Sequence, residues 1–279
     1  MALNGIDISS YQAGINLAIV PCDFVIIKVT QGTRYVNAEW KRQAEQAINT
    51  GKLVAFYHYA EGTNPSAERE FFLKQLGDYA QYYPMACDWE QANNIRYHVS
   101  DTQWVSDFMS GLPYSKQNMI YCSALDRGYF DHLGHPMWIA QYADTNPTGY
   151  QTNPWNEANT PCTIRQYSGT GRLNGWGENL DLNKFYGDKK TWYNVFGQRK
   201  NIVLTYDKDN PMQAIIQPND EPRLVWFDGS KLHSLTHPDQ VTALQEVAKA
   251  CGTTIPTFKL GTKKAPWYTR LKQAVDLGD

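Results

Sequence analysis

Residues 24–59 read FVIIKVTQGTRYVNAEWKRQAEQAINTGKLVAFYHY. Two β-rich apolar runs, Phe24–Thr30 and Leu53–Tyr59, enclose a polar segment of helical character, Ala38–Thr50, and Gly51 is suited to end that helix. A strand, a helix and a second strand in this order predict a parallel β-α-β unit. The segment therefore indicates an α/β fold, and the same alternation can be followed along the rest of the chain.

The alternation recurs over the first two-thirds of the sequence. Six further β-rich runs are Asn4–Ser9, Met85–Glu90, Asn118–Cys122, Met137–Tyr142, Thr163–Tyr167 and Asn179–Asn183. Two further helices are expected, at Ser66–Tyr79 and at Asp101–Gly111. In the first, Ser66 is the expected N-cap, and the residues expected to face a core are Phe71, Phe72 and Leu76.

Eight strands that alternate with helices predict a closed β/α barrel. The later connections, such as Thr145–Pro161, are rich in Asn, Pro and Gly and poor in helical pattern. We therefore expect a distorted, TIM-like barrel with incomplete helices over residues 1–192.

The chain changes character near Thr191–Lys200. The β runs NIVLTY (201–206) and QAIIQ (213–217) come next, followed by RLVWF (223–227) and KLHSL (231–235) around a DGS turn. A helical stretch, Pro238–Ala250, comes after them. We expect residues 200–279 to form a small C-terminal α+β domain.

The composition excludes several classes of protein. The 279 residues carry a net charge of −2, so no global basic field points to nucleic acid or an anionic membrane as a partner. The sequence contains no run of 18 apolar residues, so membrane insertion is not expected. The N-terminus MALNGIDISSYQ lacks the pattern of a signal peptide. The five cysteines are widely spaced and contain no C-x-x-C, so neither a zinc site nor a disulfide framework is expected. Cys87 and Cys122 lie in apolar runs and are expected to be buried free thiols.

The stretch MACDWEQ (85–91) ends an apolar run with two carboxylates. Residues two apart in a strand share a face, so Asp88 and Glu90 project together while Trp89 points the other way. Two adjacent like charges raise the pKa of one carboxyl, an arrangement used for acid and base chemistry. Asp7 and Asp181 lie in the first and eighth runs, which are neighbours in a closed barrel. The alternative is solvated carboxylates at strand ends.

A set of motifs follows the eight strands in chain order. They are GIDISSYQ (5–12), FVIIKVTQGT (24–33), FYHYA (56–60), CDWE (87–90), IYCS (120–123), WIAQY (138–142), RQYS (165–168) and DLNKF (181–185). With these motifs, which cover about residues 1–190, the chain resembles glycoside hydrolase family 25. The resemblance is greatest to the bacteriophage endolysins among these peptidoglycan-cleaving muramidases.

The resemblance implies a catalytic site of four carboxylates. No metal-ligand spacing is present in the sequence, so neither a metal nor a cofactor is expected. Glu90 corresponds to the general acid, with a pKa expected to be raised by the charges of Asp88, Asp7 and Asp181. Asp88 either attacks the anomeric carbon or orients the 2-acetamido group of the substrate as internal nucleophile, and we favour the second, with retention of configuration. Asp7 and Asp181 are expected to position other groups of the site and to maintain its negative electrostatic field. The alternative is that they close the barrel through hydrogen bonds to the backbone.

Several further residues are candidates for substrate binding. Aromatic side chains in the runs can stack on sugar faces, although strand alternation must direct about half of them into the core. The chosen candidates are Tyr59, Tyr121, Trp138, Lys28 and Gln166. Lys28 would bind a lactyl or peptide carboxylate, or pair with an aspartate of the cleft. His58 is expected to be structural.

The function that follows is an N-acetylmuramidase that cleaves the β-1,4 bond between N-acetylmuramic acid and N-acetylglucosamine. As a phage endolysin without a signal peptide, it would wait in the host cytoplasm and then act on the cell wall, as a monomer or weak homo-oligomer. Its partner would be peptidoglycan, with residues 200–279 as a cell-wall-binding domain. The alternatives are a non-catalytic wall-sugar-binding barrel and a glycosidase acting on chitin-like polymers.

The aromatic residues of the C-terminal domain leave a further choice open. Exposed rings would bind the wall, whereas buried rings would form the core of the domain. The rings concerned are Trp226, Phe227, Trp267 and Tyr268. A third possibility is that this domain mediates self-association.

Overall fold

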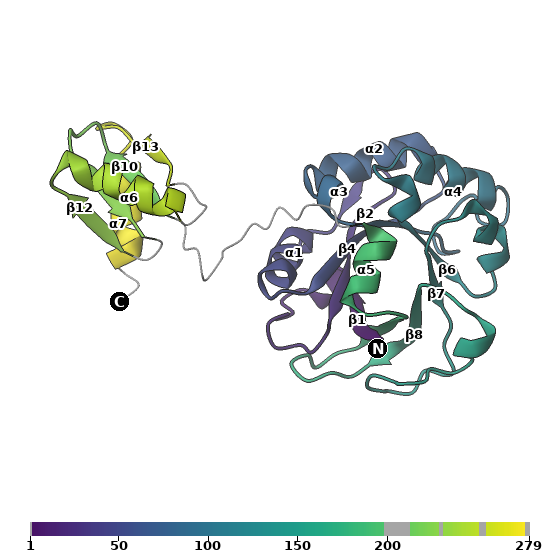
Figure 1. Ribbon diagram of the computed structural model, residues 1–279. Coiled ribbons are helices and arrows are strands. Elements are labelled where there is room, and N and C mark those ends of the chain that lie inside the picture. Colours follow the sequence, from purple (N-terminus) through teal and green to yellow (C-terminus); the bar gives the residue numbers. More distant parts are fainter. Residues whose placement is uncertain (1, 198–212, 229–230, 251–254, 277–279) are drawn as a thin grey trace. The chain divides into compact units, whose positions relative to one another are not determined.

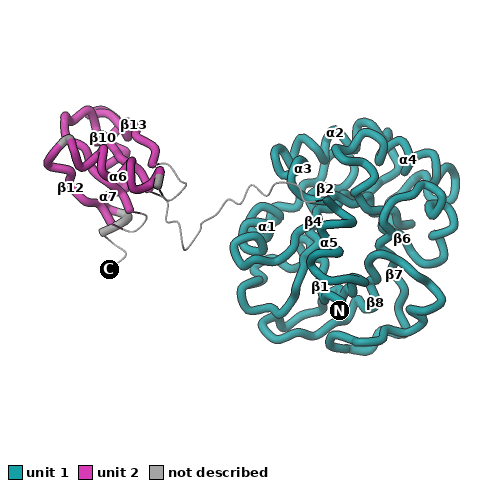
Figure 2. Tube along the Cα trace, in the orientation of Figure 1, with its two compact units in different colours: residues 1–202 teal, residues 203–279 magenta. Residues whose placement is uncertain are grey.

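The computed structural model describes residues 2–197, 213–228, 231–250 and 255–276. The chain forms two compact units, Met1–Ile202 and Val203–Asp279 (Figure 2). The sequence predicted that the barrel domain ends at residue 192, but helix α5 (Lys189–Phe196) continues past that position. It belongs to the first unit, because Trp192 and Phe196 are buried with side chains of the barrel strands.

The first unit is a closed barrel of eight strands (Figure 1). The strands are β1 (Leu3–Ile8), β2 (Phe24–Gln31), β4 (Leu53–Tyr59), β5 (Met85–Asp88), β6 (Met119–Ser123), β7 (Met137–Ala140), β8 (Ile164–Gly171) and β9 (Leu180–Phe185). Each of the eight predicted runs forms one of them, and β1 closes the barrel by pairing with both β2 and β9. A short strand, β3 (Tyr35–Val36), was not predicted and pairs antiparallel with β2.

The eighth strand differs from the expectation of a wholly parallel barrel. Strand β9 runs antiparallel to both of its neighbours, β8 and β1. Parallel strands need a crossover of about a dozen residues or more, and the connection over residues 172–179 is shorter than that. The chain therefore turns back directly into β9, which brings Asp181 level with Asp7 on β1.

Helices cover the outside of the first half of the barrel. They are α1 (Trp40–Asn49), α2 (Pro65–Leu76), α3 (Tyr79–Tyr82) and α4 (Asp101–Ser110). Later connections carry only short 3-10 turns, Arg127–Tyr129, Asp131–Leu133 and Glu157–Asn159, so the expectation of incomplete helices is confirmed.

The start of helix α2 corrects one prediction. Asn64 is the N-cap and accepts a hydrogen bond from the amide of Ala67 at 3.0 Å, whereas Ser66 lies inside the helix. Pro65 at the first helical position favours this earlier start. Phe72 and Leu76 are buried as expected, and Phe71 is partly buried.

The inside of the barrel is packed with apolar side chains at the amino-terminal ends of the parallel strands. Phe24 and Phe185 contact Trp192 of α5, with ring centroids 5.2 Å apart in each pair. Gly5 leaves room for this packing, since a Cβ there would lie 2.4 Å from the ring of Phe24. Helix α5 thus closes this end, and the polar side chains of the interior gather at the opposite end, where active sites of such barrels lie.

The second unit contains a four-stranded sheet in the order β12-β11-β10-β13. Its elements are β10 (Ala214–Pro218), β11 (Leu224–Phe227), β12 (Leu232–Leu235), α6 (Pro238–Ala250), β13 (Thr257–Leu260) and α7 (Trp267–Asp276). Strand β13 and helix α7 were not predicted. The expected run 201–206 and residues 229–230 of the expected turn lie outside the described residues.

The aromatic residues of this unit divide between core and surface. Phe227 and Tyr268 are buried and form its core, together with residues of β10. Trp226 is partly buried, and Trp267 remains 59% exposed. The alternative in which these rings form the core therefore holds for Phe227 and Tyr268.

Two further observations bear on the chemistry of the chain. Cys87 and Cys122 are buried and free, as expected from their apolar surroundings. Within the described residues, every helix is too short or too polar to span a bilayer.

Candidate active site

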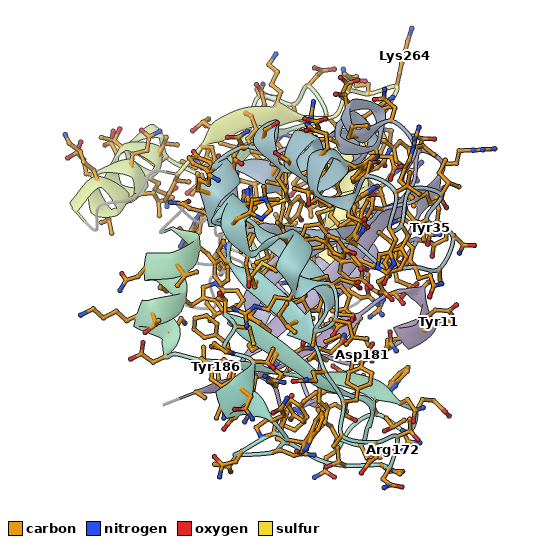
Figure 3. The ribbon with its side chains drawn as sticks, turned by 90° about the vertical axis from the view of Figure 1, so that its right-hand side faces the viewer. Tyr11, Tyr35, Arg172, Asp181, Tyr186 and Lys264 are labelled. Atoms are coloured by element: carbon orange, nitrogen blue, oxygen red, sulfur yellow. The ribbon has the colours of Figure 1, made fainter. Side chains whose placement is uncertain are left out.

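The four candidate carboxylates meet inside one end of the barrel. Asp7 and Asp88 project inward from β1 and β5, Asp181 projects from β9, and Glu90 lies just beyond the end of β5. Their charges interact across the barrel, Glu90 with each of the three aspartates. Figure 3 shows Asp181 on the same side of the barrel as Tyr11 and Tyr35, with Tyr186 on the opposite side. The predicted convergence of these carboxylates is therefore observed.

Asp88 and Glu90 form a hydrogen-bonded pair of carboxyl groups. Burial, and next the charge of Glu90, raise the pKa of Asp88. Burial likewise raises the pKa of Glu90, whereas the hydrogen bond with Asp88 and the charge of Lys28 lower it. Two carboxyl groups can share a hydrogen bond only when a proton lies between them, so the pair retains one proton where isolated carboxyls have lost theirs. The pKa of Glu90 is therefore raised as predicted, but the predicted cause is wrong: burial raises it, and the neighbouring Asp88 lowers it.

The two carboxyls of this pair differ in their surroundings. Asp88 is 4% exposed, and its Oδ1 has no hydrogen-bond partner among the described residues. Glu90 is partly exposed and lines a pocket. Trp89 between them points away, as predicted, and its Nε1 donates to Asp101 at 2.6 Å. The deeper carboxyl therefore has a free acceptor, and the outer one faces solvent.

Asp7 and Asp181 form a second carboxyl pair. Oδ2 of Asp7 accepts hydrogen bonds from Nδ2 of Asn183 at 2.6 Å and from Nε2 of Gln166 at 2.9 Å. Burial raises the pKa of Asp7 to about 6, against the effect of these two donors. Burial and the charge of Asp7 raise the pKa of Asp181 to about 8. Near neutral pH, Asp7 is therefore ionised and Asp181 protonated.

Asn183 is a functional candidate that the sequence reasoning missed. It lies two residues after Asp181 in the DLNKF motif, so strand alternation places it on the same inner face. Its Oδ1 accepts a hydrogen bond from Nε1 of Trp138 at 2.8 Å, which orients its amide nitrogen toward Asp7.

Gln166 and Trp138 hold the carboxylates in place through hydrogen bonds, whereas the sequence predicted that they contact the substrate. Gln166 bonds Asp7 directly, and Trp138 does so through Asn183. Oε1 of Gln166 accepts from Oη of Tyr121 at 2.7 Å and also from Oη of Tyr142, while its Nε2 donates to Asp7. Trp138 is only 1% exposed, because it is enclosed by the interior of the barrel. From that position its ring cannot stack on a sugar.

A pocket of about 440 Å³ opens beside Glu90. Its lining residues are Trp89, Glu90, Gln91, Tyr97, Tyr121, Ser123, Leu125, Asp126, Ala140 and Tyr142. Tyr121 thus lines the pocket as expected. Tyr97 and Asp126, which the sequence did not single out, are held together by a hydrogen bond from the tyrosine hydroxyl to Oδ2 of Asp126 at 2.6 Å.

Lys28 supplies a positive charge to the Asp88–Glu90 pair. Its Nζ donates to Oε1 of Gln31 at 2.8 Å and lies 4.3 Å from the ring centroid of Tyr59. Burial lowers the pKa of Lys28, and the charges of Asp88 and Glu90 oppose that shift. The hydrogen bond of Lys28 is made to Gln31, and only its charge reaches Asp88 and Glu90, so both of its predicted roles stay predictions.

Tyr59 and His58 occupy opposite faces of β4. The hydroxyl of Tyr59 donates to the carbonyl of Ala92 at 2.7 Å, so this ring is fixed beside Lys28. His58 is fully buried between Thr30 and Glu68, which agrees with its predicted structural role. Among the described residues, no group of three or more His, Cys, Asp and Glu side chains is arranged to hold a metal ion.

Comparisons with known proteins agree with this geometry. The profile of "Glycosyl hydrolases family 25" matches residues 6–176. Lysozyme M1 of Streptomyces globisporus is 29% identical over 209 residues, which span 66% of this chain and 68% of that protein. The bacterial lysozyme of Streptomyces coelicolor superimposes with a TM-score of 0.55 at 24% identity, over 70% of this chain and 97% of the other.

A phage protein has the same fold. The catalytic domain of endolysin ply40, from bacteriophage P40 of Listeria monocytogenes, superimposes with a TM-score of 0.56 at 19% identity. The match covers 71% of this chain and 98% of that domain.

A closed barrel with buried, proton-sharing carboxylates beside an open pocket defines a barrel glycosidase. The chain belongs to glycosyl hydrolase family 25. It is a glycoside hydrolase of the muramidase, or lysozyme, type, and peptidoglycan is its class of substrate.

Proposed function

We propose that this chain hydrolyses the β-1,4 bond between N-acetylmuramic acid and N-acetylglucosamine, with Glu90 as the general acid. The observation that carries the proposal is the Asp88–Glu90 pair, which keeps a proton through burial while Glu90 lines an open pocket. A carboxyl that is protonated near its working pH can donate to the leaving oxygen of a glycoside. Asp88, which is deeper, cannot reach that oxygen as readily.

The unpartnered Oδ1 of Asp88 supports a substrate-assisted mechanism. A buried acceptor without a donor is costly, and the N–H of a 2-acetamido group would satisfy it. This contact would hold the acetamido carbonyl oxygen against the anomeric carbon, so that the oxygen attacks as Glu90 protonates the leaving group. The configuration is then retained after water opens the cyclic intermediate. Direct attack by Asp88 is the second mechanism.

Asp7 and Asp181 together supply a negative charge near the sugar ring. The ionised Asp7, fixed by Asn183 and Gln166, faces the positive charge that grows on the sugar ring in the transition state. Asp181 in its protonated form donates a hydrogen bond to Asp7, so that the pair carries a single negative charge.

The proposed biological role is that of a phage endolysin that lyses the wall of its bacterial host. The likeness of the barrel to an endolysin catalytic domain supports it. For the second unit we propose wall binding through its exposed rings, of which Trp267 is 59% and Phe258 44% exposed. The protein would wait in the host cytoplasm, reach the wall on release, and act there as a monomer or weak homo-oligomer.

The test of the catalytic proposal compares wild type with Glu90→Gln on purified peptidoglycan and identifies the new reducing ends. Wild type should release fragments that end in N-acetylmuramic acid, and the variant should lose at least about a hundredfold in rate. Glu70→Gln, at an exposed position of helix α2 on the outside of the barrel, is the matched control and should keep the wild-type rate.

Three other results would each change the proposal. Ends in N-acetylglucosamine would keep the fold and overturn the bond assignment. Cleavage of chitin polymers in preference to peptidoglycan would favour the chitin-like substrate. Binding to walls without any cleavage would favour a sugar-binding barrel.

The role of the second unit needs a separate measurement. Glu90→Gln should sediment with walls, and Glu90→Gln/Trp267→Ala should do so less. Equal sedimentation of the two proteins would remove Trp267 from the proposed binding surface.

A further inference from the structure

Tyr11 is a large aromatic side chain presented to solvent at the catalytic end of the barrel. It lies in a 3-10 turn, Ser10–Gln12, that follows β1 directly, four residues after Asp7. Its side chain is 90% exposed. Figure 3 shows it projecting on the side of the barrel that also carries Tyr35 and Asp181. Single exposed tyrosines are common, so exposure alone does not indicate a binding site.

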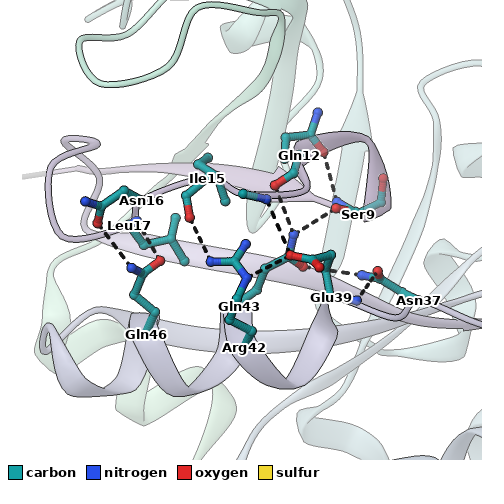
Figure 4. A network of polar contacts seen from close by, with 11 residues as sticks. Ser9, Gln12, Ile15, Asn16, Leu17, Asn37, Glu39, Arg42, Gln43 and Gln46 are labelled. Atoms are coloured by element: carbon teal, nitrogen blue, oxygen red, sulfur yellow. Dashed lines mark hydrogen bonds and ion pairs between the residues drawn. The ribbon is translucent and has the colours of Figure 1, made fainter.

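The segment that carries Tyr11 is held by a network of polar contacts (Figure 4). Ser9 caps the turn, accepting at Oγ from the amide of Tyr11 and donating its own amide to Oε1 of Gln12 at 3.0 Å. Gln43 of α1 is fully buried and donates through Nε2 to the carbonyl of Ser9 at 2.8 Å.

The segment after the turn is tied to the same helix. Arg42 donates to the carbonyl of Ile15 at 3.0 Å, and Gln46 accepts from the amide of Leu17 at 2.8 Å. A buried glutamine that hydrogen-bonds a turn fixes its backbone, since loss of the bond would leave a buried polar group unpaired. The exposure of Tyr11 is therefore imposed by a rigid support and is not the fraying of a loose loop.

A second tyrosine connects this turn to the catalytic centre. Tyr35 of β3 shares a hydrogen bond between its hydroxyl and Oγ of Ser10 at 2.8 Å, and its side chain is 40% exposed. The ring centroid of Tyr35 lies 5.6 Å from Nζ of Lys28, and the ring of Tyr59 lies 4.3 Å from the same nitrogen. Lys28 thus lies near the rings of both Tyr59 and Tyr35, and Tyr35 in turn contacts the turn that carries Tyr11.

We infer that Tyr11 and Tyr35 form a distal subsite that binds a sugar ring of the glycan strand several units from the bond that is cut. The apolar face of a pyranose packs against an aromatic ring, and a ring held in place binds without losing side-chain freedom. The inference rests on the proposed function, because it takes its ligand to be the same glycan strand that Glu90 cleaves.

The test compares wild type with Tyr11→Ala on two substrates, long glycan strands freed of cross-links and a tetrasaccharide of the same wall. The ratio of kcat/KM on long strands to kcat/KM on the tetrasaccharide should fall about 3- to 10-fold, through KM, as expected for one aromatic contact. Tyr11→Phe keeps the ring and should restore the wild-type ratio. An unchanged ratio in Tyr11→Ala, or no rescue by Tyr11→Phe, would overturn the subsite.

A matched control uses a tyrosine at the other end of the barrel. Tyr114 is 53% exposed and precedes β6, at the amino-terminal end of the strands. Tyr114→Ala should keep the wild-type ratio, and an equal fall in this variant would assign the effect to a general change in the protein.

Binding separates failure of the subsite from failure of the proposed function. We would measure how strongly immobilised long glycan strands retain Glu90→Gln and Glu90→Gln/Tyr11→Ala. Both proteins lack the proposed general acid, so the strands are not cleaved during the measurement. Weaker retention of the double variant supports the subsite even if wild type cuts no wall, a result that would remove the hydrolytic proposal alone. Equal retention overturns the subsite whatever the activity of the wild type.

Discussion

Asp7 and Asp181 are directly paired residues of the antiparallel strands β1 and β9, and their carboxyl groups have pKa values raised to about 6 and about 8. The difference follows from their partners. Two amide donors stabilise the ionised form of Asp7, whereas burial and the charge of Asp7 hold the proton on Asp181. The pair therefore acts as one negative charge with a fixed position.

This division of charge makes a prediction about Asp181→Asn. An amide resembles the protonated carboxyl, so the variant should keep activity within about tenfold of wild type at pH 6. Asp181→Ala should lose about ten- to a hundredfold there, because one charge-assisted hydrogen bond of about 1.5–3 kcal/mol is removed. Steady-state rates on peptidoglycan at pH 6 measure both. Equal loss in the two variants would show that Asp181 acts as an ionised carboxylate.

The same substitution should change how stability depends on pH. The pKa of Asp181 is raised on folding from 3.8 to about 8, so the folded state binds more protons between these values. Stability from this group is then complete below pH 4, falls as pH rises, and is lost above pH 8. Asp181→Asn removes that loss, and its Tm relative to wild type should rise from pH 4 to pH 8 by at least about 2 °C. A constant difference in Tm would contradict the raised pKa.

Lys28 sets the pH range in which the Asp88–Glu90 pair holds one proton. Its charge lowers the pKa of both carboxyls. Its other neighbours are Gln31, Glu61 and the rings of Tyr35 and Tyr59. Lys28→Met removes that charge, so both protons of the pair should leave at higher pH. Both limbs of the bell-shaped pH–rate profile should move upward, whereas Lys28→Arg, which keeps the charge, should move them less. A profile that stays in place would separate Lys28 from the proton of this pair.

The positions of the strands could be predicted from the sequence, whereas the direction of the last strand could not. Runs such as Phe24–Thr30 are apolar because both faces of a barrel strand are buried, and this signal is local. The direction of β9 depends on the length of the connection over residues 172–179, which an alternating pattern does not contain. The pairing of Asp7 with Asp181 was expected from barrel closure, but their level register follows from the antiparallel β9.

Side-chain roles were less predictable, because they depend on depth inside the barrel. Trp138 and Tyr121 both face the inside of the barrel, yet Trp138 is the more buried and bonds Asn183, while Tyr121 reaches the pocket. Asn183 shares a face with Asp181 and could have been found by the same alternation. Its importance appears only through its bond to Asp7, which joins residues far apart in the chain.

A buried network behind the site supports the loop between β4 and α2. Glu68 of α2 is fully buried, and its carboxylate is within hydrogen-bonding distance of Nε2 of His58 at 2.9 Å, the amide of Glu61 at 3.0 Å and both the amide and hydroxyl of Thr63. Burial raises the pKa of Glu68, but the hydrogen bonds from His58 and Thr63 outweigh it, so the pKa is lowered. Burial lowers the pKa of His58, which is therefore neutral and donates to an ionised glutamate.

Glu68→Gln should destabilise the barrel by about 2–4 kcal/mol, because the new amide group presents donors to donors in a buried site. The loss should appear as a lower urea midpoint with an unchanged slope. Glu70→Gln, at an exposed position of the same helix, is the matched control and should stay within about 0.5 kcal/mol of wild type. The loop that Glu68 holds also carries Glu61, which accepts a hydrogen bond from Gln31, the partner of Lys28. The variant should therefore lose activity as well. A destabilised variant with wild-type kcat and KM would confine this network to stability.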